Sequence, residues 1–89
     1  MKNLKESADL PADKIFRKFG IRNGQLVAKN EQQNDKIDSI IEELEAAGFK
    51  QEKSAAGGEY QYEYTKDFET VMINYRYGKG YQAIWIDDK

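Results

Sequence analysis

The side chains able to do chemistry in this chain are carboxylates, lysines, tyrosines and serines, because histidine and cysteine are both absent. That absence removes the commonest general base, thiolate nucleophiles, disulfides and cysteine-type zinc sites. Four acids lie close together between Glu59 and Glu69, but Glu59 and Glu63 alternate with tyrosines as outward residues of a strand. No nucleophile has a base at a suitable spacing. The sequence therefore predicts a protein with no enzymatic activity, no cofactor and no bound metal.

A second group of candidate residues lies in the run Tyr75–Trp85, which holds four aromatic residues, one arginine and one lysine. Such rings can stack on nucleic-acid bases while the cations contact phosphates. The segment Lys79–Ile86 partly resembles the octapeptide of RNA-recognition motif domains, since its first three residues match. Ala83 stands where that family has a base-stacking ring, and the order of elements differs. We therefore give base reading less weight than a protein interface or a packed core.

Charge is unevenly distributed along the chain, whose net charge is −2. Residues 1–30 carry seven cations and three anions, whereas residues 31–69 carry eleven acids and four lysines. Phosphate contacts dominate nucleic-acid affinity, and an acidic body opposes them. The acidic run favours the opposite idea, a surface that imitates DNA phosphates. Direct nucleic-acid binding, through the basic helix 11–19 and the aromatic terminal hairpin, remains the alternative hypothesis.

Two helices are predicted in the first half of the chain. Pro11 suits a first helical turn, and Gly20 suits the position after a last turn, so the first helix spans 11–19. Isoleucine and leucine at positions 37, 40, 41 and 44 have helical spacing. With Asn34 as N-cap and Gly48 after its end, the second helix spans 34–47. Between the helices, Asn23-Gly24 indicates a short hairpin or a plain turn.

The second half of the chain alternates with the period of a strand. The expected strands are 49–53, 59–65, 70–77 and 81–86, and the short links between them favour antiparallel neighbours. The fold class is therefore α+β: one or two N-terminal helices, then an antiparallel β-meander of three to four strands, with helix 34–47 packed on one sheet face. Residues 1–89 form a single domain, in which 1–8 are expected to be flexible and 87–89 are a charged tail.

Strand register follows from the rule that opposed residues share a face. A four-residue loop at 66–69 pairs Tyr64 with Val71 and Tyr62 with Ile73, which collects the large apolar side chains on one face. The last hairpin has two alternatives. A two-residue loop puts Ile84 and Ile86 on the core face and turns Tyr81 and Trp85 outward. A three-residue loop, Gly78–Gly80, does the reverse.

Either register leaves an apolar pair on the second face of the sheet. An exposed apolar patch on a sheet usually has a cover. Helix 11–19 supplies that cover in one interpretation, and a second molecule supplies it in the other.

No motif identifies a protein family. The short, acidic, tyrosine-rich chain resembles, as a class, the small proteins of phages and mobile elements, many of which block a host protein, as anti-CRISPR or anti-restriction inhibitors do. We therefore expect a protein-binding module that inhibits a host nucleic-acid-processing or defence complex. The candidate partner-binding residues are Arg76, Tyr77, Lys79, Tyr81 and Trp85, followed by the acidic residues Asp38, Glu42 and Glu45.

The remaining expectations concern partners and location. The partner is a host protein or complex, contacted at its nucleic-acid-binding surface, and a homodimer through the last strand is a further hypothesis. No apolar run approaches the roughly 20 residues that span a bilayer, and the first ten residues have no signal-peptide character. We therefore expect a cytoplasmic protein that makes no membrane contact.

Overall fold

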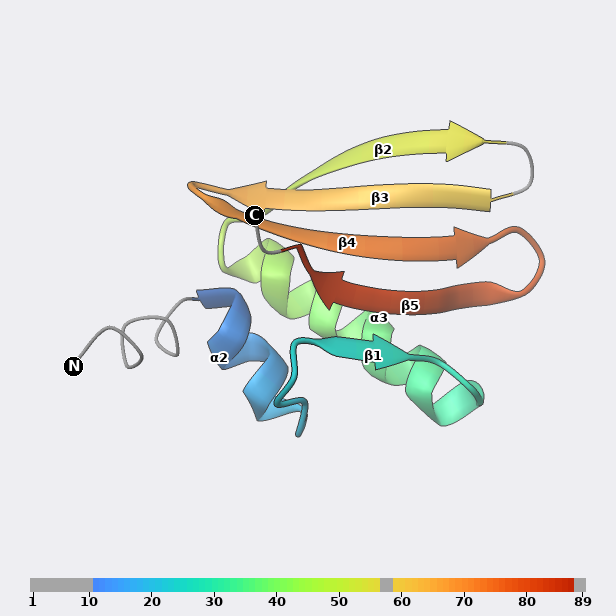
Figure 1. Ribbon diagram of the computed structural model, residues 1–89, viewed down its shortest axis with the longest axis horizontal. Helices are drawn as coiled ribbons and strands as arrows, with labels where there is room; N and C mark the ends of the chain where they lie inside the picture. Colours follow the sequence, from blue (N-terminus) through green and yellow to red (C-terminus); the bar gives the residue numbers. More distant parts are fainter. Residues whose placement is uncertain (1–10, 57–58, 88–89) are drawn as a thin grey trace.

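The computed structural model describes residues 11–56 and 59–87, with the side chains of 53–56 and 59 left out of the description. Within these residues the chain forms two helices and a five-stranded antiparallel sheet (Figure 1). The elements in order are α2 (Pro11–Lys18), β1 (Gln25–Val27), α3 (Glu31–Ala46), β2 (Lys50–Ala56), β3 (Glu59–Lys66), β4 (Glu69–Arg76) and β5 (Gly80–Ile86). The α+β fold class is confirmed. The predicted flexible segment 1–8 and most of the predicted tail lie outside the described residues.

The sheet has the strand order β1-β5-β4-β3-β2, so β2 to β5 form the predicted meander and β1 is added beside β5. The predicted register between β3 and β4 is confirmed, with Tyr64 opposite Val71 and Tyr62 opposite Ile73. The predicted four-residue loop 66–69 is wrong, because Lys66 pairs with Glu69 and the turn is only residues 67–68. Asn23-Gly24 forms a turn and not a hairpin, because the strand after it pairs with β5. There the backbone N–H of Gln25 donates to Asn23 Oδ1, and Gly24 has a φ of 74°. β1 is therefore an edge strand of the sheet, although it precedes α3 in the sequence.

Helix α3 begins one turn earlier than predicted. Asn30 is its N-cap, because Asn30 Oδ1 accepts the backbone N–H of Gln33 at 2.9 Å. Gln33 Oε1 accepts the backbone N–H of Lys29 at 2.7 Å in return. The two side chains thus form a capping-box-like pair, for which Asn-x-x-Gln was the available signal. Asn34, the predicted N-cap, lies inside the helix, and its Nδ2 donates to the backbone oxygen of Tyr81 at 2.8 Å.

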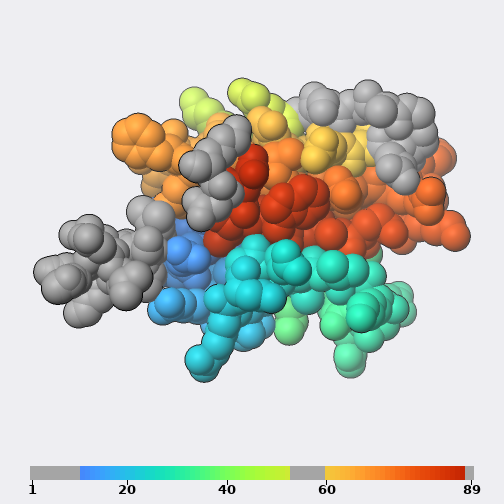
Figure 2. Space-filling model, in the orientation of Figure 1, coloured from blue at the N-terminus to red at the C-terminus, as the bar shows by residue number. Residues whose placement is uncertain are grey.

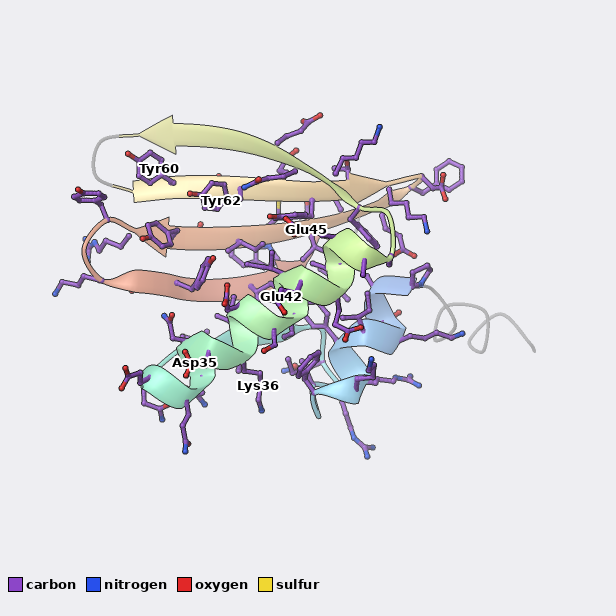
Figure 3. The ribbon with its side chains drawn as sticks, turned by 180° about the vertical axis from the view of Figure 1, so that it is seen from behind. Asp35, Lys36, Glu42, Glu45, Tyr60 and Tyr62 are labelled. Carbon is purple, nitrogen blue, oxygen red and sulfur yellow. The ribbon has the colours of Figure 1, made fainter. Side chains whose placement is uncertain are left out.

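Both helices lie on one side of the sheet (Figures 1 and 3). The core between helices and sheet consists of Ala12, Ile15, Phe16, Ile21, Ile37, Ile40, Ile41, Leu44, Phe49, Tyr64, Val71, Ile73 and Ile84. The prediction that helix 11–19 covers the second sheet face is therefore wrong, because Ile15 and Phe16 are used in this core. Lys18 Nζ forms an ion pair with Glu43 at 3.0 Å, and Lys36 Nζ donates to the backbone oxygen of Phe19, which hold α2 beside α3. No helix of the described residues is long and apolar enough to cross a membrane.

Glu69 joins the start of α2 to the sheet. The backbone N–H of Ala12 is one of the first-turn donors without a partner inside the helix, and it donates to Glu69 Oε1 at 2.9 Å. Burial raises the pKa of the Glu69 carboxyl above its ordinary value of about 4.5, although this hydrogen bond opposes the rise. The folded state therefore disfavours the charged form of Glu69 while it uses one carboxyl oxygen as a cap.

Glu69→Gln is expected to keep the cap and remove the buried charge, whereas Glu69→Ala removes both. Because the folded-state pKa is raised, the stability that comes from protonating Glu69 is present at low pH and lost as the pH rises above about 4.5. The free energy of unfolding of Glu69→Gln should therefore increase relative to that of the wild type as the pH rises above about 4.5. Glu69→Ala should lose about 1 kcal/mol at neutral pH. Urea unfolding at several pH values measures both, and equal losses in the two variants would contradict the account.

Candidate protein-binding surface

A β-bulge in strand β5 places Tyr81 and Trp85 on opposite faces of the sheet. Near the turn Tyr75 lies opposite Tyr81, but further along Ile73 lies opposite Ile84, so Gln82 is one residue in excess. Tyr81 consequently faces the helices together with Ile84, while Trp85 lies on the other face opposite Met72. Both predicted arrangements kept Tyr81 and Trp85 on one face, and that expectation is wrong. The alternative that placed Ile84 and Ile86 on the core face is confirmed for these two residues. Ile84 is fully buried, and Ile86 packs against the core.

The physical reason for the bulge lies in the neighbours of Gln82 and Gly80. The backbone oxygen of Gln82 accepts the N–H of Ala28 at 2.9 Å, so Gln82 pairs toward the β1 side of the sheet. Gly80 has a φ of 95°, a backbone conformation that residues other than glycine rarely adopt. A Cβ at Gly80 would also meet Asn34 Nδ2 at 2.9 Å. Asn34 thus fits against the bare glycine and holds the adjacent Tyr81 backbone against α3.

Gly80→Ala is expected to lower the free energy of unfolding by about 1–3 kcal/mol, because it adds left-handed strain and a clash with the Asn34 amide. Urea unfolding gives the change in stability. Gly78→Ala is the matched control, since Gly78 has a φ of 82° but no atom within 4 Å of its Cβ position. Equal losses at the two glycines would mean that the fit of Asn34 against Gly80 contributes nothing.

Four tyrosines form a continuous row of rings on the helix side of β3, β4 and β5, and we call Tyr60, Tyr62, Tyr75 and Tyr81 the tyrosine face. Tyr60 and Tyr62 are stacked at a centroid distance of 6.4 Å, and Tyr62 and Tyr75 are 6.1 Å apart. Tyr75 and Tyr81 meet edge to face at 5.2 Å. All four rings are half-buried. They therefore combine a fixed ring geometry with surface still open to solvent.

The tyrosine face stays open because α3 crosses only part of the sheet. Helix α3 packs against β5 and β1, and Figure 3 shows Tyr60 and Tyr62 on the strands beyond the helix. Strand alternation correctly put these rings on the core face of the sheet. Alternation does not tell where a helix lies along that face, so Tyr60, Tyr62 and Tyr75 were missed as surface candidates.

One side of α3 carries three acids next to these rings, and we call Asp38, Glu42 and Glu45 the acidic flank. They are spaced i, i+4 and i+7, which places them along one stripe of the helix, and all three are exposed. The Tyr81 hydroxyl donates to Asp38 Oδ1 at 3.4 Å, and the Tyr64 hydroxyl donates to Glu45 Oε2 at 3.0 Å. The acidic flank is therefore tied directly to the tyrosines of the sheet.

These contacts keep the two tyrosine hydroxyls protonated. Burial, aided by the charge and the hydrogen bond of Asp38, raises the pKa of Tyr81 to about 12. Burial, aided by the hydrogen bond to Glu45, raises the pKa of Tyr64 even further above the ordinary value of a tyrosine. Both hydroxyls remain neutral donors at physiological pH, so the negative charge of this surface comes from the carboxylates.

The opposite side of α3 is occupied by α2. On that side, Lys36 donates to the backbone oxygen of Phe19 and Glu43 forms an ion pair with Lys18. Figure 3 shows Lys36 pointing away from the strands that carry Tyr60 and Tyr62. Among the described residues of α3, the flank toward the tyrosines thus has acids and no cation.

The structure divides the other predicted site residues between two places. Arg76 follows Met72 and Asn74 in the strand alternation, so it lies with Trp85 on the helix-free face of the sheet. Figure 2 shows the molecule from the side on which β5 and β1 lie in front of α3. Tyr77 and Lys79 lie in the β4–β5 turn, where Tyr77 is 75% exposed. Only Tyr81, Asp38, Glu42 and Glu45 come together. The eight predicted residues therefore do not form one surface.

The helix-free face has its own small apolar patch. Trp85 lies opposite Met72 and Gln25, and Ala83 lies opposite Val27, which is 51% exposed. Strand β5 is paired on both edges, with β1 and β4. A homodimer that adds a strand to β5 would need a free edge there, so a copy of the chain can meet β5 only through a face of the sheet and not by edge pairing.

The residues of the nucleic-acid hypothesis are also separated. Helix α2 and the β4–β5 turn lie at opposite ends of the long axis (Figure 1). Their cations therefore do not form one continuous phosphate-binding track. Among residues 11–56 and 59–87, no cluster of carboxylates is arranged to hold a metal ion.

Comparison with protein-family models, with curated proteins and with solved structures gives no match to this chain. The functional argument therefore rests on the chemistry of the tyrosine face and the acidic flank.

Proposed function

We propose that this chain is a non-enzymatic protein-binding module that docks on its partner through the tyrosine face and the acidic flank. The observation that carries the proposal is the row of four half-buried tyrosine rings in mutual contact beside a helix flank of three exposed acids. Tyrosine supplies large contact area at low entropic cost and is enriched at interface hot spots. Here the rings are already ordered by one another and by Asp38, so little ordering remains to be done on binding.

We further propose that the partner is a host nucleic-acid-processing or defence complex, which the module inhibits in the cytoplasm in the manner of a phage or mobile-element protein. The spacing of Asp38, Glu42 and Glu45 along one exposed helix stripe supports this idea. Carboxylates in such a row can replace phosphates at a basic nucleic-acid-binding surface. The tyrosines beside them add apolar anchors that a phosphate backbone lacks.

Site-specific photocrosslinking in host cells tests the proposal. A benzoylphenylalanine in place of Tyr62 samples the tyrosine face, and the same residue in place of Trp85 samples the opposite face of the sheet. We expect the Tyr62 position to capture a defined host protein in a band that the Trp85 position does not give. Circular dichroism of both proteins confirms that the fold survives the replacement.

Two results would overturn the proposal. The absence of any crosslinked protein at either position would remove the protein-binding function. A band found only from the Trp85 position would move the interface to the helix-free face and reject the tyrosine face.

A further inference from the structure

We infer that the tyrosine face and the acidic flank together receive a basic protein segment whose arginine side chains lie against the rings and pair with the carboxylates. The inference rests on the proposed function and names the chemistry of its partner. Two properties of the surface lead to it: the nature of the rings and the balance of charge around them.

The rings supply negative faces. A cation within about 6 Å of a tyrosine ring is attracted by the ring quadrupole, more so where water is partly excluded. The four half-buried rings of the tyrosine face stand within 5.2–6.4 Å of their neighbours along the row. An extended segment laid along the row can therefore bring successive cationic side chains to successive rings.

The acidic flank supplies the matching charge. Asp38 and Glu45 accept hydrogen bonds only from uncharged tyrosine hydroxyls in the described contacts, so their negative charge is not neutralised by those contacts. Lys36, the lysine within α3, donates to Phe19 on the α2 side. At the Tyr81 end of the row, Lys29 and Lys79 line the same pocket as Glu31 and Asp35, so the charges there balance. The negative charge beside the rings therefore comes from the three carboxylates of the acidic flank, which are complementary to a cationic segment.

Arginine suits this surface better than lysine does. Its planar guanidinium can lie flat on a ring and still donate to a carboxylate at its edge, whereas the compact, strongly hydrated lysine ammonium does one or the other. A nucleic acid is the occupant that the same surface disfavours, because carboxylates repel phosphates. The inference therefore commits to an arginine-bearing protein segment.

Fluorescence anisotropy with three labelled probe peptides tests the inference. The probes are four repeats of Ser-Arg, of Ser-Lys and of Ser-Glu, each carrying the same rhodamine dye. We expect the arginine peptide to bind more tightly than the lysine peptide, the glutamate peptide not to bind, and the affinity to fall as salt is added. Equal affinity for the arginine and lysine peptides, or tighter binding of the glutamate peptide, would overturn the inference.

Two isosteric double variants with the same net charge separate the site from general electrostatics. Asp38→Asn with Glu42→Gln should weaken arginine-peptide binding at least about fivefold. The matched control, Glu52→Gln with Glu63→Gln, removes two acids that oppose each other on the helix-free face, and it should change the affinity by less than about twofold. Equal effects of the two double variants would reduce the binding to net charge and overturn the inference.

Two single variants add tests of the rings and of the sign of charge. Tyr62→Leu keeps apolar bulk and removes the ring face, so it should weaken binding about threefold. Lys79 lines the same pocket as Tyr81, and Lys79→Gln should leave the affinity for the arginine peptide unchanged or raise it. A loss of affinity in Lys79→Gln, or no loss in Tyr62→Leu, would contradict a cation-receiving surface.

The same charge variant separates this inference from the proposed function. If Asp38→Asn with Glu42→Gln still gives the host crosslink from position 62, the module docks there without cation recognition, so the inference fails and the function stands. If wild type gives no crosslink, the function fails whatever the peptides do.

Discussion

Ile84→Lys is expected to leave the chain unfolded at room temperature, whereas Trp85→Lys, one residue further on, is expected to leave it folded. Ile84 is fully buried between the sheet and the helices, so a lysine there must bury an unpaired charge or open the core. Either outcome costs several kcal/mol out of a stability of about 5–15 kcal/mol for a native domain. At position 85 the lysine ammonium can reach water from the helix-free face.

Far-UV circular dichroism and the dispersion of amide NMR signals measure the result in both variants. The pair is a direct test of the register between β4 and the second half of β5, because the alternative three-residue register exchanges the environments of these two residues. A folded Ile84→Lys protein together with an unfolded Trp85→Lys protein would show that the register described for β5 is incorrect.

The second large effect concerns the interface. Tyr62→Ser combined with Tyr81→Ser should lower the affinity for the crosslinked host partner by at least about a hundredfold, as expected when two clustered aromatic anchors are lost. The two replacements remove one ring from β3 and one from β5, the two outer strands of the row. They also remove the Tyr81 hydroxyl, which donates a hydrogen bond to Asp38. Surface plasmon resonance with the purified partner measures the change.

Trp85→Ser is the matched control, because it removes a larger aromatic ring from the opposite face of the same sheet. It should change the affinity by less than about threefold. Circular dichroism confirms that all variants are folded before affinities are compared. If Trp85→Ser costs more affinity than the double tyrosine variant, the tyrosine face is not where the partner docks.

Much of the fold follows from local patterns in the sequence. The alternation of Tyr60, Tyr62 and Tyr64 with polar residues determines which face of β3 is apolar, and only one register then matches that face to the apolar face of β4. The helical spacing of Ile37, Ile40 and Leu44 likewise identifies α3 and its buried stripe. These features are predictable because neighbouring residues alone determine them.

The features that define the candidate surface depend on contacts between distant residues. The bulged residue Gln82 accepts a backbone hydrogen bond from Ala28, which follows β1 and lies more than 50 residues earlier in the sequence. Asn34 looks like an N-cap in the sequence, yet it contacts Tyr81 across the core boundary. The extent to which α3 covers the sheet likewise depends on its packing against α2. Strand alternation alone therefore assigned Tyr81 to the same face as Trp85 and counted the other tyrosines as core.

The central claim is that the module binds basic protein segments with its helix side and not with its helix-free side. Two-dimensional ¹⁵N NMR during titration with the Ser-Arg peptide tests it most directly, because the single tryptophan, Trp85, reports on the opposite face through its indole N–H. We expect shifts at the amides of Tyr62, Tyr75, Tyr81 and residues 38–45, with the Trp85 indole signal unmoved. A shift of the indole signal with the tyrosine-face amides unmoved would contradict the claim.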